Sequence, residues 1–218
     1  MAETKTSRNI DNVSNIRTAE DVEILVLTCP SYAHLLDDFF KRFDKYYGKR
    51  TKELRVWRGA GVWSDELIKA LDTVDDEYLI VLHEDFYFVN YTNIKALDRI
   101  IRYMHTHSAV GRINCSYGIH APERVTQHED IYWKYKDDAE YICSFCASIW
   151  RKSFMLRYLV EGEDPWRGEV NMSNRVKNTG ETVLWSEIPV FFYEDAMRGG
   201  EFVEVPAYVE TKLPNIEI

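Results

Sequence analysis

The stretch Tyr78-Leu-Ile-Val-Leu82 leads into His83-Glu84-Asp85 and then into Phe86-Tyr87-Phe88. Its first five residues are apolar or aromatic and rich in Leu, Ile and Val, which is typical of a strand buried on both faces. The strand should end where polarity begins, and there the chain carries two adjacent carboxylates. In an open α/β sheet, ligands bind in the crevice at the carboxyl ends of the strands. Glu84 and Asp85 are therefore a candidate metal or substrate site, unless they cap the next turn or pair with an Arg.

Length and composition describe one folded domain with an acidic surface. A chain of 218 residues can enclose a full core, and a hydrophobic content of 45% with 29% charged residues is typical of globular proteins. The net charge of -9 disfavours non-specific binding to nucleic acid, because such binding depends on neutralising phosphates.

The cysteines and the apolar runs predict a cytoplasmic protein. No apolar run approaches the roughly 18 residues that span a bilayer, and the first six residues lack the apolar core of a secretory signal. Cys143-x-x-Cys146 lies in an alternating segment that would place the two thiols on opposite faces of a strand, a poor geometry for zinc. We expect buried, reduced thiols, as in intracellular proteins, at all four cysteines: Cys29, Cys115, Cys143 and Cys146.

The first 85 residues predict strand-helix-strand-helix-strand. Residues 22–27 and 53–57 should be strands that precede the one at 78–82. The intervening helices should begin at Ser31 and Ser64, which are plausible N-caps. This order indicates a mostly parallel central sheet flanked by helices, with right-handed crossovers, and hence a single α/β domain of Rossmann-like type.

The remaining chain should continue the same domain. Asp164 and Pro165 are typical of a helix start, and residues 115–140 look like a long irregular loop. The other expected elements are helices over 94–104 and 151–160 and strands over 110–114, 141–149 and 189–193. We expect a flexible arm over 1–20, the domain over 21–195 and a tail or flap over 196–218.

The carboxyl ends of the first four strands should lie side by side along one edge of the sheet. Besides Glu84 and Asp85, this edge should carry hydroxyl, aromatic and basic groups that suit a nucleotide diphosphate. Carboxylates can hold Mg²⁺ or Mn²⁺ together with substrate phosphates, and an Arg can clamp a phosphate oxygen. The other residues at the four ends are Thr28, Cys29, Pro30, Ser31, Tyr32, Trp57, Arg58, His83, Asn114, Cys115 and Ser116.

A second constellation lies at Asp164-Pro-Trp-Arg-Gly-Glu169. A sugar ring could stack on Trp166 while Glu169 takes a hydroxyl proton as a general base. The alternative is an ordinary N-cap at Asp164, with a packed Trp166 and a surface Glu169. Further along, Arg198 precedes two glycines, so it could close over a diphosphate or could be solvated surface charge.

Several familiar motifs are missing from the sequence. It contains no Gly-x-Gly-x-x-Gly after the first strand and no Gly-x-x-x-x-Gly-Lys-Ser/Thr, which argues against a classical dinucleotide fold and a P-loop NTPase. It also lacks the Gly-x-Ser-x-Gly elbow of many hydrolases.

The order and spacing of the segments resemble a GT-A-type glycosyltransferase, of the kind found in polysaccharide and surface-glycan gene clusters or in phages. The opening strand Val22 to Pro30 is similar to the strand that reaches the nucleotide, and Gly61-Val-Trp63-Ser64 to the segment before the metal-site strand. Glu77 to Phe88 resembles the acidic motif of the family, although His83-Glu84-Asp85 is not a strict Asp-x-Asp. Ser148-Ile-Trp-Arg151 together with Asp164 to Glu169 resembles the block that lines the acceptor side.

This resemblance covers residues 22–195 and implies transfer of a sugar, from a nucleotide sugar (in the first place a UDP-sugar) to a hydroxyl acceptor. Asp85 would hold Mn²⁺ or Mg²⁺, and Glu84 would help through the metal or the ribose. Glu169 would be the base, with Asp85 as the other catalytic residue. Trp150 and Trp166 would bind the acceptor. The donor would be bound by Thr28, Pro30, Ser31, Tyr32, Trp57, Arg58, Trp63, Ser64, Glu84 and Arg198.

Three alternatives stay open. A virus-type DNA glycosyltransferase acting on hydroxymethylated bases would use the same chemistry, and a basic groove near Arg151, Lys152 and Arg157 would support it against the net charge of -9. A Mg²⁺-dependent nucleotidyltransferase would need a second acidic cluster beside the first. A non-catalytic nucleotide-sugar-binding protein would keep its function without Asp85.

Overall fold

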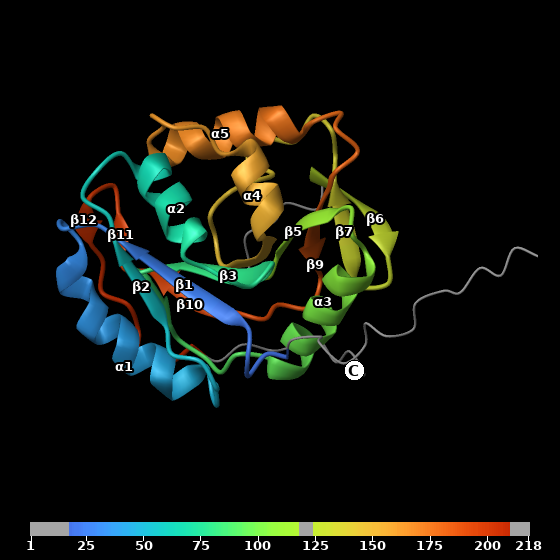
Figure 1. The fold of residues 1–218 in the computed structure, drawn as a ribbon. Coiled ribbons are helices and arrows are strands. Elements are labelled where there is room, and N and C mark those ends of the chain that lie inside the picture. The colour runs from blue at the N-terminus through green and yellow to red at the C-terminus, as the bar shows by residue number, and fades with distance from the viewer. Residues whose placement is uncertain (1–17, 118–123, 210–218) are drawn as a thin grey trace, which may run out of the picture.

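The computed structural model describes residues 18–117 and 124–209, which form an α/β fold around a mixed eight-stranded sheet (Figure 1). The strand order is β2-β1-β3-β8-β5-β9-β7-β6, and the core of the sheet is mostly parallel. This confirms the predicted fold class. The strands of this sheet are β1 (Glu23–Thr28), β2 (Arg55–Arg58), β3 (Tyr78–His83), β5 (Val110–Asn114), β6 (Val125–Glu129), β7 (Tyr132–Tyr135), β8 (Ser148–Arg151) and β9 (Thr182–Ser186).

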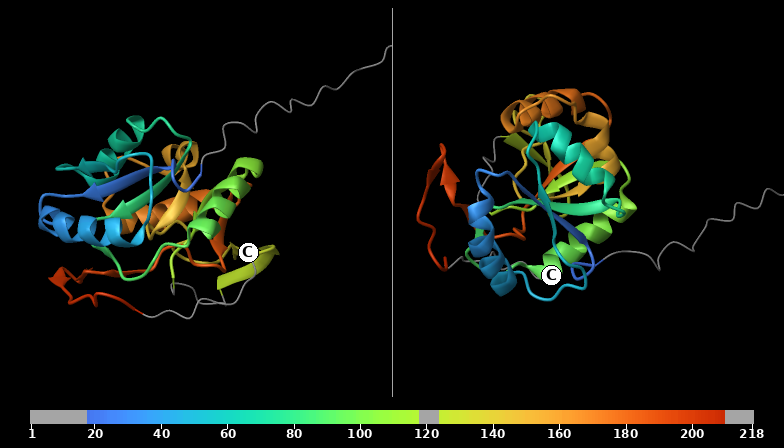
Figure 2. Two further views of the ribbon diagram at one scale, coloured as in Figure 1. Left: turned by 90° about the horizontal axis from the view of Figure 1, so that it is seen from below. Right: turned by 60° about the vertical axis from the view of Figure 1, so that its left-hand side comes forward.

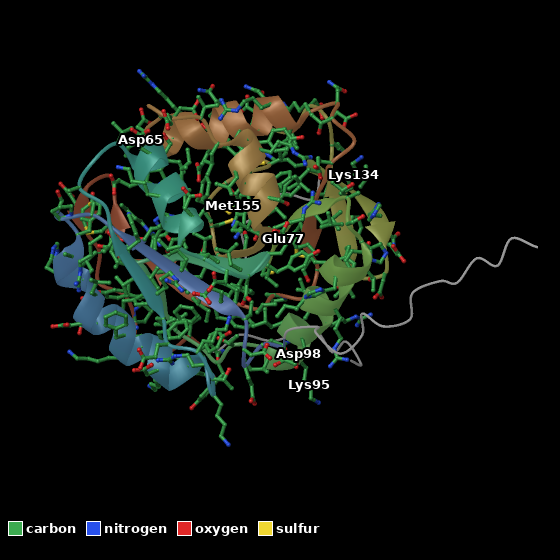
Figure 3. The ribbon with its side chains drawn as sticks, viewed as in Figure 1. Asp65, Glu77, Lys95, Asp98, Lys134 and Met155 are labelled. Atoms are coloured by element: carbon green, nitrogen blue, oxygen red, sulfur yellow. The ribbon has the colours of Figure 1, made fainter. Side chains whose placement is uncertain are left out.

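Helices cover both faces of the sheet. The helices α1 (Leu36–Tyr46) and α3 (Ile94–Thr106) pack on one face, and α2 (Trp63–Asp72), α4 (Lys152–Tyr158) and α5 (Pro165–Val176) pack on the other. Figure 3 shows this division through Asp65 of α2 and Asp98 of α3, which lie on opposite sides of the sheet.

The central strands are continuous apolar runs because both of their faces are covered. In β1, Ile24 and Val26 join the core beneath α1 and α3, whereas Leu25 and Leu27 join the core beneath α2, α4 and α5. Successive side chains of a strand point to opposite faces, so a run without polar breaks is what two covered faces require.

The strand β8 runs antiparallel to both of its neighbours, β3 and β5. Its first residue, Ser148, pairs with Val81 near the end of β3, and its last, Arg151, pairs with Tyr78 at the start of β3. The carboxyl ends of β1, β2, β3 and β5 therefore do share one edge of the sheet, as predicted, but β8 separates β5 from the other three.

Residues 124–140, predicted as irregular loop, contain the hairpin β6–β7. The first of these strands lies at the end of the sheet, and four of its five side chains are exposed. An edge strand with so little burial lacks the apolar alternation that would have revealed it. Residues 118–123 lie outside the described part of the chain.

The strand predicted over 141–149 begins only at Ser148. Side chains, rather than a neighbouring strand, bind the preceding backbone: the N–H of Cys143 donates to Ser173 Oγ and the N–H of Phe145 donates to Glu169 Oε1. Tyr141 adopts a positive φ of 55°. The alternating residue types therefore predicted a strand wrongly, because the backbone N–H groups of this segment bind side chains of α5.

The last predicted strand, over 189–193, is displaced along the chain. Residues before it form β9, which the sequence analysis missed, and β10 (Tyr193–Asp195) pairs antiparallel with β4 (Phe86–Phe88) in a separate two-stranded sheet. Between them Phe191 makes a single bridge to Ser116.

The helix starts are only partly as predicted. Asp164 is the N-cap of α5, and its side chain accepts a hydrogen bond from the N–H of Arg167 at 2.9 Å. Ser64 lies inside α2, whose N-cap position is Val62, and Ser64 Oγ accepts from the N–H of Glu163. The short helix η2 (Ala33–Leu35) precedes α1 and lacks a side-chain cap.

Both ends of the described chain dock on the domain. Ala19 is buried and its N–H donates to Asp98, so residues 18–20 of the predicted arm belong to the folded part. The rest of that arm, residues 1–17, lies outside the described part of the chain. At the other end, β11 (Met197–Arg198) and β12 (Glu201–Phe202) form a small hairpin at the periphery, on the side of α1 (Figure 2). Arg42 of α1 donates to the carbonyl oxygen of Val205, which fixes the segment after the hairpin.

No helix in the described residues has the length and apolar character needed to cross a membrane.

Candidate functional site

A cleft of about 1160 Å³ opens where β1, β2 and β3 end. The glycine-containing loop before α2 lines it, as do the turn after β3, the segment before β8, the first turns of α5, and β10 with the hairpin that follows. Eight of the predicted site residues line it: Thr28, Tyr32, Trp57, Trp63, Glu84, Asp85, Trp166 and Glu169.

Glu84 fastens the turn after β3 to the end of β1. Its side chain is buried, and burial raises the pKa of the carboxyl group. Hydrogen bonds to the carboxylate from its own N–H, from the Thr28 hydroxyl and from the backbone of Cys29 act in the opposite direction. Glu84 therefore holds two strand ends together at the base of the cleft.

A second carboxylate in the cleft, Asp195, lies close enough to Asp85 for its charge to raise the pKa of Asp85, and the sequence analysis did not single it out. Asp195 reaches the site because β10 pairs with β4, and the N–H of Ala196 donates to the carbonyl oxygen of Asp85 at 2.8 Å. Burial, together with the charges of Asp195 and Glu84, raises the pKa of Asp85 to about 7. Asp195 is an exposed residue, and partial desolvation of its carboxyl group is the main reason that its pKa is also raised. A signal did exist, since Asp195 also follows an apolar run, Val190-Phe-Phe192.

The donor set of this pair fits a hard divalent cation. Carboxylate oxygens are preferred ligands of Mg²⁺ and Mn²⁺, and Mg²⁺ commonly takes one or two carboxylates together with substrate phosphates. Among residues 18–117 and 124–209 no group of three or more His, Cys, Asp or Glu side chains forms a complete metal site. Asp85 and Asp195 would thus hold a cation whose remaining ligands come from a substrate and water.

His83, whose role the sequence left open, is a neutral residue of the cleft wall. Burial lowers the pKa of its imidazole to about 4, so it is uncharged at neutral pH. Its ring meets the ring of Phe86 edge-on, with centroids 5.2 Å apart.

The wall at the end of β2 offers a flat surface beside a glycine loop. Trp57 Nε1 donates to Glu66 Oε2 at 3.2 Å, which fixes the indole. A Cβ on Gly59 would come within 2.7 Å of Glu66 Cβ, and one on Gly61 within 2.8 Å of Glu66 Oε1, so the loop packs closely on α2. The N–H of Gly59 also donates to the carbonyl oxygen of Thr28, which joins this loop to the end of β1.

The wall formed by α5 carries Trp166 and Glu169. Trp166 is 74% exposed, an unusual exposure for so large an apolar side chain. Glu169 Oε1 accepts from the N–H of Phe145 at 2.6 Å, and burial raises the pKa of its carboxyl group. When a sugar ring stacks on the exposed indole, the half-buried carboxylate beside it can accept a proton from a hydroxyl group of that sugar.

Six predicted site residues lie outside the cleft lining. Pro30, Ser31 and Arg58 are exposed, and Ser64 is buried in the contact between α2 and the segment before α5. Arg198 pairs with Glu194 at 2.9 Å.

Trp150 is fully buried, stacked on Phe145 and beneath the guanidinium of Arg112, so it is a core residue with no surface for an acceptor. The structure also corrects the expectation for the cysteines. Cys115 and Cys143 are buried, but Cys29 and Cys146 are half-buried and line the cleft.

Besides Asp195, the sequence analysis missed residues that the fold brings to the cleft from distant segments: Glu66, Ser144, Phe145, Cys146, Tyr193 and Met197.

No protein-family model and no curated protein matches this chain. Among solved structures, TarS of S. aureus (residues 1–349) superposes with a TM-score of 0.51 and 12% sequence identity, over 79% of this chain and 60% of that one. The chain therefore spans less than two thirds of that structure. CMP:2-keto-3-deoxy-manno-octonic acid synthetase complexed with CTP matches with a TM-score of 0.45 and 12% identity, over 79% of this chain and 91% of the other. UDP-glucose pyrophosphorylase complexed with UDP-glucose matches with a TM-score of 0.45 and 11% identity, over 79% and 74%.

The likeness to TarS concerns the fold alone, an α/β fold with a mostly parallel, Rossmann-like central sheet flanked by helices.

Proposed function

We propose that this protein is a glycosyltransferase that moves a sugar from a nucleotide sugar to a hydroxyl acceptor. The proposal rests on the set of side chains that line one cleft, at the edge of the sheet where the parallel strands have their carboxyl ends. It combines a carboxylate pair, Asp85 and Asp195, with a half-buried Glu169 and an exposed Trp166. In open α/β sheets this edge is where nucleotides bind.

The donor is bound between the ends of β1, β2 and β3. Trp57 and Tyr32 provide flat surfaces for a base, and the loop at Gly59 and Gly61, which packs on Glu66 of α2, lines the cleft beside them. Asp85 and Asp195 would hold Mn²⁺ or Mg²⁺, and such an ion would supply positive charge to the leaving diphosphate.

The acceptor is bound on the α5 side. A sugar ring of the acceptor stacks on Trp166, and Glu169 takes the proton from its attacking hydroxyl group. The hydrogen bond from the N–H of Phe145 orients the Glu169 carboxylate. The raised pKa of Glu169 makes this carboxylate a better base than that of an exposed Glu.

A donor screen tests the proposal. The full chain is incubated with UDP-, GDP- and CMP-sugars, with and without Mn²⁺, and followed by release of the free nucleotide and by thermal shift. We expect Mn²⁺-dependent release from one sugar class, above all a UDP-sugar, and its loss in Asp85→Asn but not in the exposed control Asp138→Asn. Silence with every nucleotide sugar, alongside a thermal shift with free nucleoside triphosphates, would overturn the proposal.

A nucleotidyltransferase is the second candidate, and one observation favours it. This class needs further acidic groups beside the first carboxylates, and Asp195 lies beside Asp85. It would release pyrophosphate from a nucleoside triphosphate in the presence of a sugar phosphate or a sugar acid, whereas the glycosyltransferase would not. The same screen, extended to nucleoside triphosphates with these co-substrates, separates the two.

A DNA acceptor is less well supported. Arg151 and Arg157 both pair with Glu181, and Lys152 donates to the carbonyl oxygen of Val74. Because Arg151 pairs with Tyr78, at the start of β3, these cations lie at the edge of the sheet opposite to Asp85. They do not form a basic groove along the cleft.

A further inference from the structure

A buried cation lies behind the cleft, in the strand β5. The guanidinium of Arg112 is fully buried, stacks over the ring of Trp150 at 4.9 Å and donates through Nη1 to the carbonyl oxygen of Ile142 at 2.7 Å. Its Nε has no hydrogen-bond partner among residues 18–117 and 124–209. A buried charge is normally compensated by an opposite charge. Within the described residues, however, no carboxylate forms an ion pair with Arg112. The charge of Arg112 acts on the Glu169 carboxylate only at longer range.

The hydrogen bonds of this cation converge with others on one sulfur atom. Arg112 Nη2 donates to Cys146 Sγ at 3.0 Å, and Asn114 Nδ2 donates to the same sulfur at 3.0 Å. Ser144 Oγ lies 3.2 Å from Cys146 Sγ and accepts from Arg112, so its own proton can point to the sulfur. Three hydrogen-bond donors, one of them a buried cation, therefore surround the Cys146 sulfur.

Cys146 is also accessible. It is half-buried and, with Ser144, lines the cleft, whereas Arg112 approaches it from inside the protein. Reactive cysteines are found in partially exposed, electropositive surroundings of this kind, and buried structural cysteines are inert.

The other three cysteines lack this combination. Cys115 and Cys143 are fully buried, and burial raises the pKa of each thiol to about 12. Cys29 lines the same cleft and is half-buried, but within the described part of the chain no hydrogen bond ends on its sulfur. Cys29 is therefore an internal control with similar access and without the donors.

We propose that Cys146 is a thiol-modification site, which takes small disulfides of the glutathione type. The Cys146 sulfur attacks one sulfur of the disulfide, the S–S bond of the reagent breaks, and the second half leaves as a thiolate that takes up a proton. A mixed disulfide with Cys146 remains, and a small thiol reverses it. The adduct occupies the cleft next to Phe145, the residue whose N–H holds Glu169.

The test measures modification itself and does not depend on the proposed transferase activity. The native full chain is treated with oxidised glutathione at pH 7, and the occupancy of each cysteine is followed by peptide mass spectrometry after the unreacted thiols have been blocked. We expect Cys146 to react at least about tenfold faster than Cys29, with no reaction at Cys115 or Cys143. In denaturant the four cysteines should react at similar rates. Equal rates at Cys146 and Cys29 in the native chain would overturn the proposal.

Two variants test whether the hydrogen-bond donors around the Cys146 sulfur cause its reactivity. Ser144→Ala and Asn114→Ala each remove one donor and should slow the reaction of Cys146 several-fold while leaving Cys29 unchanged. Circular dichroism checks that each variant is folded. If either donor variant folds and Cys146 reacts as fast as in the wild type, the arrangement around its sulfur is not the cause and the proposal fails in that part. The comparison between Cys146 and Cys29 in the wild type needs no variant and decides the site by itself.

Discussion

Single residues set the chemistry of the cleft, and Glu169 is the one to change first. Glu169→Gln keeps an oxygen that can accept from the N–H of Phe145, so the fold around it should persist. Loss of a general base should lower kcat by about 10²–10⁴-fold with little change in KM. The measurement is steady-state kinetics with the sugar donor found in the screen.

Glu161→Gln is the matched control, because Glu161 is an exposed residue just before α5. It should leave kcat unchanged. If Glu169→Gln retained the wild-type kcat, another group would have to be the base.

Asp85 should make the stability of the metal-free protein depend on pH. Its pKa is raised from 3.8 to about 7, so between these values the folded chain binds more protons than the unfolded chain. The free energy of unfolding therefore falls as pH rises through this range and stays low above pH 7. Asp85→Asn removes this penalty and should stabilise the protein at pH 8 by about 2 kcal/mol, roughly half of what the full shift corresponds to.

Urea unfolding in EDTA at pH 4 and pH 8 measures this effect. The gain from Asp85→Asn should be largely absent at pH 4, because this pH lies close to the unfolded-state pKa of 3.8 and ionisation there has only begun to favour the unfolded chain. Asp138→Asn, in an exposed loop, should show no such pH dependence. A gain that is equal at both pH values would contradict the raised pKa.

At the scale of elements, the contact between α2 and α5 shapes the wall of the cleft that α5 forms. A Cβ on Gly168 would lie 2.6 Å from Cζ3 of Trp63, so the helix approaches the indole as closely as glycine allows. Gly168→Ala should destabilise the protein by about 1–3 kcal/mol through overpacking, although alanine favours the helix by about 1 kcal/mol. Denaturant unfolding measures the difference.

A second substitution, at Trp63, tests whether steric crowding between the introduced alanine and the indole causes the loss of stability. Trp63→Leu creates room, so Gly168→Ala should cost less in the Trp63→Leu background than in the wild type, and a double-mutant cycle gives the coupling energy. Additive effects of the two changes would mean that the ring and the helix do not compete for space.

The strands show which element types the sequence could reveal. β1 and β3 were predictable because coverage on both faces demands an apolar run. β6 was not, because it is an exposed edge strand, and the segment before β8 was misassigned because its backbone hydrogen bonds go to side chains of α5. Periodicity reports burial and cannot report which partner a backbone group finds.

For the whole molecule, ligand binding should appear as added stability. UDP together with Mn²⁺, at about 100 times the dissociation constant, should add about 2.7 kcal/mol to the free energy of unfolding. For a chain of this length that corresponds to a rise in Tm of about 5–10 °C. Thermal shift measurements with UDP alone should give a smaller rise.

Asp85→Asn and Asp195→Asn should each remove the Mn²⁺-dependent part of the rise and keep the part that UDP produces alone. The exposed Asp138→Asn should retain both parts. Wild-type shifts that are the same with and without Mn²⁺ would contradict a metal held by this pair.

The sequence by itself determined the fold class, the edge of the sheet at which the cleft opens, and eight of the residues that line this cleft. It could do so because buried strands are apolar and because polar residues at their ends must serve capping or binding. Only the tertiary structure decided that Asp195 stands beside Asp85, that Trp150 is core, and that Arg112 lies behind Cys146. These juxtapositions depend on strand pairing and on packing between segments far apart in the chain, and local patterns carry no record of them.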